Sequence, residues 1–357
     1  MIDLSLDSSD MLGKIREMPR HLRAGLQLGQ QAWHSLAAPR PEALVVAGMG
    51  ASALCGDLLR SYLAGDADIP VVVFRDYGLP RFVGEQMMVV VSSYSGNTEE
   101  AVSALEDAVA RKAFVVCITS GGRLLEEARR RSLPYVQIPG GLPPRASLGY
   151  SFSALLALAC RLGLCPDPAD EIASCAEHLE GLNQTYRDLD PARNPALQLG
   201  CDLRGRVPIL YCGGGLEAVA LRWKNQFCEN SKQLAFASVL PEANHNEVMG
   251  WEGGVEGLAA GIVLLRAAGE HPSVARSLSI LKRLAGADGR ICGEFWASGS
   301  SLLCRQFSLI LIGDYASAYL ALARGIDPTP IRTIDRIKAW LKEDQGTTDE
   351  SHNPSCR

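Results

Sequence analysis

The chain has 357 residues, about twice the length of one ordinary domain, so we expect two domains that share one framework. Hydrophobic residues make up 47% of it and charged residues 21%, which argues against a disordered, fibrous or coiled-coil protein. Its 35 basic and 40 acidic residues give a net charge of −5, so no positive excess is present for a nucleic-acid partner.

Two features predict a protein of the cytoplasm. The longest nearly uninterrupted apolar stretch, 258–265, is far short of the ~20 residues that cross a bilayer, so no membrane span is expected. The first seven residues are acidic where a secretory signal would be basic, and no apolar segment follows them.

The first half of the chain predicts a helical segment and then an α/β domain. Apolar positions recur at helical spacing within residues 1–40, and this segment is expected to pack across a later domain. Short apolar runs at 43–47, 87–91 and 114–118 each lead into a loop of glycine and hydroxyl side chains, and then into a helical stretch. Together with the run at 70–74, they predict a parallel, flavodoxin-like sheet flanked by helices over 41–164.

The second half repeats this pattern. A proline-rich break begins a polar helical connection over 165–205, after which an apolar run at 207–211, a glycine turn and a helical stretch return. We therefore expect a second similar domain over 206–342, with further strands at 234–238 and 257–265 and helices at 272–285, 300–324 and 330–342. The polar tail at 343–357 is predicted to be disordered.

Polar and glycine-rich loops follow the predicted strands of the first domain, where parallel sheets bind ligands. They are Gly48-x-Gly50-x-Ser52, Ser93-x-Ser95-Gly96-Asn97-Thr98 and Thr119-Ser120-Gly121-Gly122. Glycine lets the backbone approach an anion, helix N-termini direct N–H groups at it, and hydroxyls add neutral donors. The loops predict a phosphate site without lysine, formed by Ser52, Ser93, Ser95 and Thr98. The alternative that these side chains only cap helices stays open.

A second interpretation of the first glycine loop is a nicotinamide site. The segment from Gly48 to Ala53 also fits the pattern G-x-G-x-x-A, and Asp76 lies at the end of the next strand, where a ribose-binding acid would stand. A dehydrogenase is therefore an alternative. It is disfavoured because residues 95–98 would form a second anion site that such an enzyme does not need.

Candidate ionisable groups come from the second predicted domain and from the end of the first. Glu229 ends a predicted helix, and His245, a residue type suited to acid–base chemistry, lies in a polar loop with no core to fill. Arg145 follows two prolines that restrict the backbone, so its guanidinium can be directed at a developing oxyanion.

No pattern in the sequence predicts a metal. Glu242 and Glu247 flank His245, but no second histidine stands at ligand spacing. The 11 cysteines are scattered, odd in number and never spaced Cys-x-x-Cys, so we expect buried structural thiols rather than zinc ligands or disulfides.

Taken together, five motifs over residues 40–342 resemble the bifunctional phosphoglucose/phosphomannose isomerase family. Each motif alone is shared with the wider sugar-isomerase (SIS) domain superfamily, whereas the five in this order are typical of the family. A short anchor, Gly325-x-Asp327-Pro328-x-Pro330, precedes the last helix as well. The five are Gly48-Met49-Gly50-Ala51-Ser52-Ala53 with Gly56-Asp57-Leu58-Leu59, Ser93-Tyr94-Ser95-Gly96-Asn97-Thr98-Glu99-Glu100, Pro144-Arg145, Glu229-Asn230-Ser231-Lys232, and Leu240-Pro241-Glu242-x-Asn244-His245-Asn246-Glu247.

The resemblance implies two SIS domains and a homodimer whose active site takes the histidine from the neighbouring subunit. It implies reversible conversion of fructose 6-phosphate to glucose 6-phosphate and mannose 6-phosphate, without a metal or an organic cofactor. Glu229 would move a proton between C1 and C2 through a cis-enediol, and Arg145 would stabilise the enediolate. His245 and Lys338 would open and close the sugar ring. The phosphate would be held by Ser52, Ser93, Ser95 and Thr98.

Three further residues are expected near the substrate. Gly50 and Ala51 lie in the first loop, although Ala51 stands where the family usually has glycine. Thr329 is expected to face the substrate and to help admit both C2 epimers. Cys228 precedes Glu229 where asparagine is common, so one polar contact beside the base is missing.

Two other functions remain as alternatives. A phosphosugar-binding regulator would use the phosphate loops without chemistry, but it would not need Glu229, Arg145 and His245 together. It would also normally carry a DNA-binding module with a basic face. The second alternative is an isomerase of another phosphosugar. An amino-sugar isomerase or transferase would call for an ammonia-handling domain, for which this length leaves no room.

Overall fold

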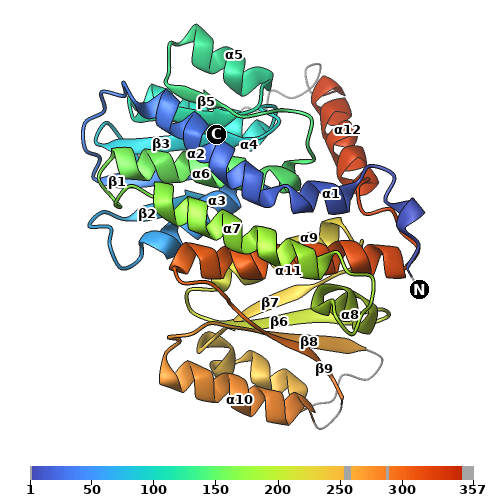
Figure 1. Cartoon of the computed structure of the whole chain (residues 1–357). Coiled ribbons are helices and arrows are strands. Elements are labelled where there is room, and N and C mark those ends of the chain that lie inside the picture. Colours follow the sequence, from blue (N-terminus) through green and yellow to red (C-terminus); the bar gives the residue numbers. More distant parts are fainter. Residues whose placement is uncertain (1, 253–258, 287–288, 348–357) are drawn as a thin grey trace, which may run out of the picture.

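Two parallel sheets, stacked with a layer of helices between them, form the framework of the molecule (Figure 1). The structure is a computed structural model that describes residues 2–252, 259–286 and 289–347. The predicted α/β class, with two mainly parallel sheets flanked by helices, is confirmed. The domain boundaries at 164 and 206 stay a prediction.

The first sheet has five strands in the order β2-β1-β3-β4-β5, all parallel. Gly48 pairs with Ser92 and Ser93 pairs with Thr119, so the carboxyl ends of three strands meet at one edge. The strands are β1 (Ala43–Gly48), β2 (Val71–Phe74), β3 (Met87–Ser93), β4 (Phe114–Thr119) and β5 (Tyr135–Gln137), and the helices that follow them are α3 (Gly50–Leu63), α4 (Glu99–Ala110), α5 (Gly122–Arg130) and α6 (Leu148–Arg161).

Both faces of the first sheet are covered, which explains its continuous apolar strands. Leu44 and Val46 of β1 belong to the core between the sheets, whereas Val45 and Ala47 belong to a second core on the side of α4 and α5. Side chains alternate between the faces of a strand, so a strand buried on both faces needs apolar residues at every position.

The second sheet has four parallel strands in the order β7-β6-β8-β9. Its outer face packs against α10 through a small core that contains Ile262, Leu264 and Leu278. The elements are β6 (Val207–Gly213), α9 (Glu217–Glu229), β7 (Phe236–Leu240), the short helices η3 (Glu242–His245) and η4 (Glu247–Trp251), β8 (Ala260–Arg266), α10 (Pro272–Gly286) and β9 (Ile291–Trp296).

The helical layer between the sheets contains one long apolar helix, α11 (Leu302–Ala323). It is long and apolar enough to cross a membrane by length and composition, but 94% of its most apolar window is buried inside the protein. A helix that is apolar all round is typical of a protein core. The sequence analysis predicted a helix at 300–324, and the structure places α11 within these bounds, with Asp314 among its mostly apolar residues. The helices η1 (Leu4–Leu6), α1 (Met11–Arg16), α2 (Met18–Trp33), α7 (Ala169–Tyr186) and α8 (Pro195–Asp202) complete the amino-terminal segment and this layer.

The last helix, α12 (Arg332–Thr347), stands beside the first domain (Figure 1). The prediction of a disordered tail from residue 343 is wrong for its first part, because the helix continues through Thr347. This end of the helix contains residues that favour helix formation, such as Glu343 and Gln345. Residues 348–357 lie outside the described part of the chain.

Several elements differ from the sequence-based expectation. Strand β7 begins two residues later than predicted, β5 and β9 were missed, and α8 falls within the helical connection predicted over 165–205. Strand β9 contains Gly293 and Glu294 and so lacks a continuous apolar run. The start of the strand expected at 257–265 falls partly outside the described residues. The described cysteines are all free, but only some are buried, and Cys201 is exposed.

Candidate active site

The loops after β1 and β3 bring the predicted phosphate-binding residues to one edge of the first sheet. Ser93 Oγ donates to Thr98 Oγ1 at 2.9 Å and accepts from the Gly96 N–H at 3.1 Å. The Ser52 hydroxyl, which is buried, accepts from the Tyr94 N–H at 3.3 Å, and Ser95 Oγ accepts from the Asn97 N–H at 3.3 Å. The hydroxyl groups are therefore positioned by the loops themselves.

Glycine at position 96 is required by both conformation and space. Its φ is +69°, and an added Cβ would lie 1.8 Å from the carbonyl oxygen of Gly121 in the neighbouring loop. Thr98 is the N-cap residue of α4, yet its side chain accepts no hydrogen bond from the first turn of that helix. Thr98 is thus not used as a helix cap, which disfavours that alternative interpretation for this residue.

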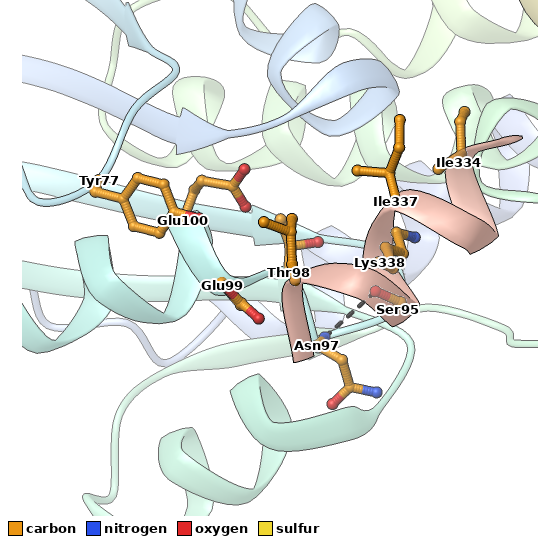
Figure 2. A pocket seen from close by; sticks show the side chains of 10 residues that line it. Tyr77, Ser95, Asn97, Thr98, Glu99, Glu100, Ile334, Ile337 and Lys338 are labelled. Carbon is orange, nitrogen blue, oxygen red and sulfur yellow. Dashed lines mark hydrogen bonds between the residues drawn. The ribbon is translucent and has the colours of Figure 1, made fainter. Parts of the chain in front are cut away.

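A cavity of about 440 Å³ opens between the β3–α4 loop and α12 (Figure 2). Ser95, Thr98 and Lys338 line it, together with apolar side chains of α12 such as Ile334 and Ile337. Figure 2 shows Lys338 next to Ser95. The loops of the predicted phosphate site contain no lysine, and Lys338 reaches this cavity from α12; the phosphate site stays a prediction. The rest of the lining is Tyr77, Asn97, Glu99, Glu100 and Leu341.

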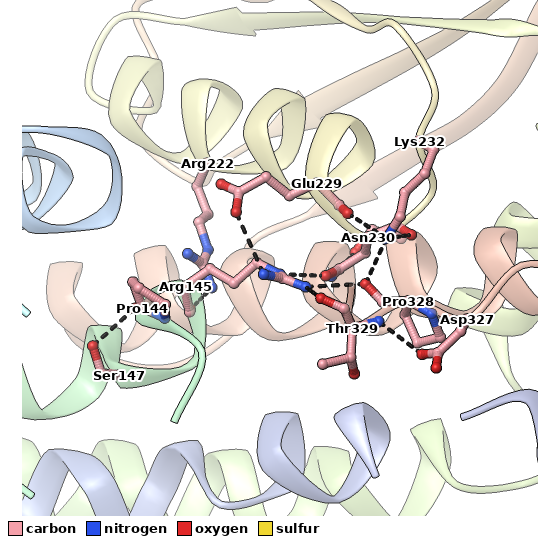
Figure 3. Close-up of polar contacts among 11 residues, drawn as sticks. Pro144, Arg145, Ser147, Arg222, Glu229, Asn230, Lys232, Asp327, Pro328 and Thr329 are labelled. Carbon is pink, nitrogen blue, oxygen red and sulfur yellow. Dashed lines mark hydrogen bonds and ion pairs between the residues drawn. The ribbon is translucent and has the colours of Figure 1, made fainter. Parts of the chain in front are cut away.

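Arg145 lies at the centre of a second group of polar contacts (Figure 3). Its side chain is 2% exposed, and its Nε donates to Asn230 Oδ1 at 2.6 Å. Its Nη2 donates to the carbonyl oxygens of Pro328 at 3.0 Å and Thr329 at 2.9 Å, while Nη1 lies 3.5 Å from Glu229 Oε2. These contacts use four of the five guanidinium N–H donors. Among the described residues, one Nη1 donor beside Glu229 has no acceptor.

The environment of Arg145 makes it a strong electrostatic group. Burial lowers its pKa, and the nearby Glu229 carboxylate opposes that shift. The guanidinium stays charged because the ordinary pKa of arginine lies far above neutrality. A buried positive charge with fixed partners acts on a developing oxyanion more strongly than a solvated one.

A buried ion pair supports the backbone of Arg145. Arg222 donates to both carboxylate oxygens of Asp314, at 3.0 and 2.8 Å, and its Nη2 also donates to the carbonyl oxygen of Arg145 at 2.6 Å. Asn230 Nδ2 donates to Ser317 Oγ at 2.9 Å, which holds the amide that receives Arg145 Nε. The sequence analysis missed these residues, although the charged Asp314 within an apolar helix was a usable indication.

Glu229 ends α9 and lines a second cavity of about 380 Å³. Its side chain is 29% exposed, so the carboxylate is open to a ligand while its Oε2 faces Arg145. Cys228 and Lys232 line the same cavity. Ile334 of α12 lines both cavities, so the start of this helix lies between Glu229 and the phosphate loop.

Thr329 carries an unsatisfied polar atom at this site. Its carbonyl oxygen accepts from Arg145, but its Oγ1 is buried without a hydrogen-bond partner among the described residues. Buried polar atoms nearly always have a partner in native proteins, so an orphaned hydroxyl indicates a place for water or a ligand.

His245 does not join this group within one chain. It lies in η3 next to the edge strand β7 and is exposed to solvent. In the described ranges, no hydrogen bond or ion pair connects it with Glu229 or Arg145. The loop is held instead by neighbours such as Asn244, whose Nδ2 donates to Ser277 Oγ at 2.9 Å. Gly50 and Ala51 form the first turn of α3 at the phosphate edge.

Metal-ligating side chains are not clustered in the parts of the chain that the structure describes. There, no group of three His, Cys, Asp and Glu residues is arranged to hold a metal ion. The chemistry available at the site consists of the Glu229 carboxylate, the Arg145 guanidinium, the loop hydroxyls and the Lys338 amine.

Comparison with known proteins gives the class of this fold. A model of the SIS domain matches residues 40–130, and a model of the bacterial phospho-glucose isomerase C-terminal SIS domain matches residues 192–341. Tagatose-6-phosphate ketose/aldose isomerase from Escherichia coli has the same fold, with a TM-score of 0.70 and 16% identity over 92% of this chain and 96% of that one. The molecule is therefore a protein of two SIS domains.

Closer relatives define the family. The bifunctional phosphoglucose/phosphomannose isomerase of Caldicellulosiruptor bescii is 39% identical over 93% of this chain and 99% of that protein. The enzyme of the same name from Aquifex aeolicus is 34% identical over 84% of this chain and 90% of its own length. The chain belongs to the bifunctional phosphoglucose/phosphomannose isomerase family and is an isomerase. The resemblance noted in the sequence is confirmed, and the dehydrogenase alternative is not supported.

Proposed function

We propose that the protein interconverts fructose 6-phosphate with glucose 6-phosphate and mannose 6-phosphate by a metal-free proton transfer. The observation that carries this proposal is the approach of Glu229 Oε2 to Arg145 Nη1 at 3.5 Å, with the guanidinium held on its other sides by protein acceptors. A carboxylate beside a fixed cation is suited to moving a proton between carbons while negative charge develops on oxygen.

In the proposed reaction, Glu229 acts as base and then as acid. Its carboxylate takes the proton from C2 of an aldose phosphate, or from C1 of fructose 6-phosphate, to give a cis-enediol. The resulting carboxyl group returns the proton to the other carbon, and a proton shift between the two oxygens balances the charge. The one Nη1 donor of Arg145 that lacks a protein acceptor would bind the oxygen that becomes negative.

The phosphate group is assigned to the edge of the first sheet. Ser52, Ser93, Ser95 and Thr98 supply neutral donors there, next to the amino-terminal turns of α3 and α4. Gly50 and Ala51 belong to that turn of α3, and Lys338 adds a positive charge from α12. The ring-opening role that the resemblance implies for Lys338 stays a prediction.

Thr329 is assigned to specificity at C2. Its orphaned Oγ1 lies in a residue whose backbone is fixed by Arg145, so it offers a positioned hydrogen-bond partner for a sugar hydroxyl. A hydroxyl both donates and accepts, and the same group can therefore serve the two C2 epimers.

His245 is assigned to the active site of a neighbouring subunit in a homodimer. Its exposure in this chain supports that assignment, as do large apolar side chains exposed near β7, where Leu234 is 72% and Phe236 is 54% exposed. Exposed apolar patches of this kind are typical of protein interfaces. The cytoplasmic location stays a prediction.

The test is an NMR assay of fructose 6-phosphate with the purified protein in deuterated buffer that contains EDTA. We expect both aldose phosphates, with deuterium at C2, because Glu229 exchanges its proton with solvent. Products that stay free of deuterium after many cycles of turnover would indicate hydride transfer and would contradict the enediol. Loss of turnover in EDTA would contradict the metal-free mechanism.

Two outcomes would support the alternatives instead. Binding of fructose 6-phosphate without turnover would favour a phosphosugar-binding regulator. Turnover of an amino-sugar phosphate in place of fructose 6-phosphate would favour an isomerase of another phosphosugar. A Glu229→Gln sample run in parallel identifies background isomerisation.

A further inference from the structure

Lys232 lies three residues after Glu229 in a backbone conformation that lysine rarely adopts. Its φ is +52°, in the left-handed region that favours glycine. This conformation turns the chain back at the end of α9 and returns the side chain to the site. Nζ then donates to the carbonyl oxygens of Glu229 at 2.8 Å and Asn230 at 3.1 Å.

The third donor of the ammonium group reaches a different element. Nζ donates to the Pro328 carbonyl oxygen at 2.8 Å, the same oxygen that accepts from Arg145 Nη2 (Figure 3). An ammonium group has three N–H donors, and all three are thus used on backbone carbonyls. Lys232 consequently joins the end of α9, which carries Glu229, to the segment that carries Thr329 and leads into α12.

Four charged groups lie near Lys232. Arg145 faces it from the segment before α6, Glu229 from α9 and Asp327 from the segment before α12, while Arg324 donates to the Lys232 carbonyl oxygen at 3.1 Å. Desolvation and the charge of Arg145 lower the pKa of Lys232 to about 8, against the opposing effects of Asp327 and Glu229. Lys232 as a whole is exposed to solvent, and two of its three Nζ contacts are part-buried.

We propose that Lys232 is a positioning residue of the isomerase, whose ammonium group fixes Glu229 relative to Thr329 and the start of α12. The inference rests on the proposed function for its kinetic consequences. Misplacement of a reacting group by about 1 Å can cost about 100-fold in rate, so loss of this bridge affects turnover more than binding.

The bridge also gives a pH dependence with a definite sign. As the pH rises through about 8, Lys232 loses its proton, and the neutral amine has two donors for three carbonyl oxygens. One contact is then lost, and a lone pair faces an oxygen atom. The bridge is therefore complete below this pH and weakened above it, so kcat falls on the alkaline side.

The first experiment compares Lys232→Met and Lys232→Arg with a matched control, Lys112→Met. Lys112 also has a left-handed backbone, with φ +56°, directly after a helix, but it lies on the surface next to Glu85. We expect Lys232→Met to lower kcat by about tenfold or more, with KM changed by less than about threefold. Lys112→Met should leave both constants unchanged.

The pH profile of kcat separates positioning from a merely structural role. In the wild type we expect a fall in kcat above about pH 8, which Lys232→Met abolishes. In Lys232→Arg the fall should move to higher pH, because a guanidinium keeps its charge, and part of the lost turnover should return. An unchanged alkaline limb in Lys232→Met, or kcat within about twofold of the wild type, overturns the proposal.

Hydrogen exchange tests the bridge without reference to activity. At neutral pH, Lys232→Met should accelerate amide exchange in residues 326–341, whereas Lys112→Met should not. If this acceleration is found but the wild type isomerises no sugar phosphate, the proposed function fails while the bridge stands. If exchange is unchanged in an active enzyme, the bridge fails while the function stands. If Lys232→Met does not fold, the proposal is tested by the fall in kcat at alkaline pH, compared between the wild type and Lys232→Arg.

Discussion

The two domains carry loops at equivalent places with opposite contents. Strands β3 and β8 each lie beside the first strand of their own sheet, and each leads through a loop into a helix on the outer face. Both loops turn at a glycine with positive φ, Gly96 at +69° and Gly269 at +84°. In each case this glycine is the third residue after the last residue of the strand.

In the second domain the equivalent place is filled by the protein's own charges. Arg266, which is 5% exposed, donates to Glu270 at 2.8 Å and to Glu294 at 2.7 Å. The loop after β3 instead has hydroxyl side chains, and Ser93 Oγ donates to Thr98 Oγ1. Because Arg266 is already paired with carboxylates, the second loop is not suited to binding an anion. Neutral donors at a helix N-terminus, as in the first loop, favour anion binding.

The two domains share one fold, and we infer that they serve different tasks in the proposed reaction. In the proposed function, the first domain would bind the phosphate at the amino-terminal ends of its helices, and the second would supply Glu229 from the carboxyl end of α9. The segment of Arg145 and the segment of Thr329 join the two. Each prediction below changes one part of this division.

Removal of the base has the largest expected effect. Glu229→Gln keeps the shape of the side chain but cannot accept the proton, so kcat should fall by about 10²- to 10⁴-fold. Binding of fructose 6-phosphate, measured by calorimetry, should largely survive, because the phosphate site lies in the other domain. Normal turnover in this variant would show that Glu229 is not the base.

Removal of a donor from the phosphate loop has the next largest effect. Thr98→Val removes the hydroxyl that accepts from Ser93, and it should raise KM by about 10- to 100-fold, the value of a hydrogen bond to a charged group. The change in kcat should be small. Thr185→Val, at an exposed position on α7, is the control, and an equal KM effect in the control would contradict the assignment.

The sequence predicted the strands of the first sheet well because burial on both faces leaves an unbroken apolar run. The run at 43–47 became β1 with one residue added. Strand β9 was not predicted because Glu294 interrupts its apolar run. That carboxylate is tolerated in the strand because it forms ion pairs with Arg266 and Lys282. Such a partner comes from another strand or helix, so local periodicity cannot reveal it.

The site shows a similar limit. Glu229, Arg145 and the loop hydroxyls could be proposed from the sequence because their side chains have suitable chemistry. Most of the acceptors that hold Arg145 and Lys232 are backbone carbonyls, such as that of Pro328, and every residue possesses such a group. The sequence therefore indicated the candidate reacting groups but not the contacts that position them.

Opening the ion pair of the second loop should change stability but not kinetics. Glu270→Gln removes the charge that faces the buried Arg266, although Glu294 remains as a partner. We expect the free energy of unfolding to fall by about 1–3 kcal/mol, measured by urea denaturation, because a buried charged donor loses part of its pairing. If KM rose as much as in Thr98→Val, the two loops would not have separate tasks.

The smallest effect is expected where the chain departs from its family at the first loop. Ala51 lies in the first turn of α3, directly after Gly50, whose φ of +52° already provides the sharp turn. Ala51→Gly adds only backbone freedom, so the free energy of unfolding should fall by less than about 1 kcal/mol. KM and kcat should stay within about twofold of the wild type, because no donor is removed. A tenfold change in KM would instead mean that the phosphate rests against this turn so closely that one methyl group shifts it, and the anion site of the first domain would then depend on α3 more than on the β3–α4 loop.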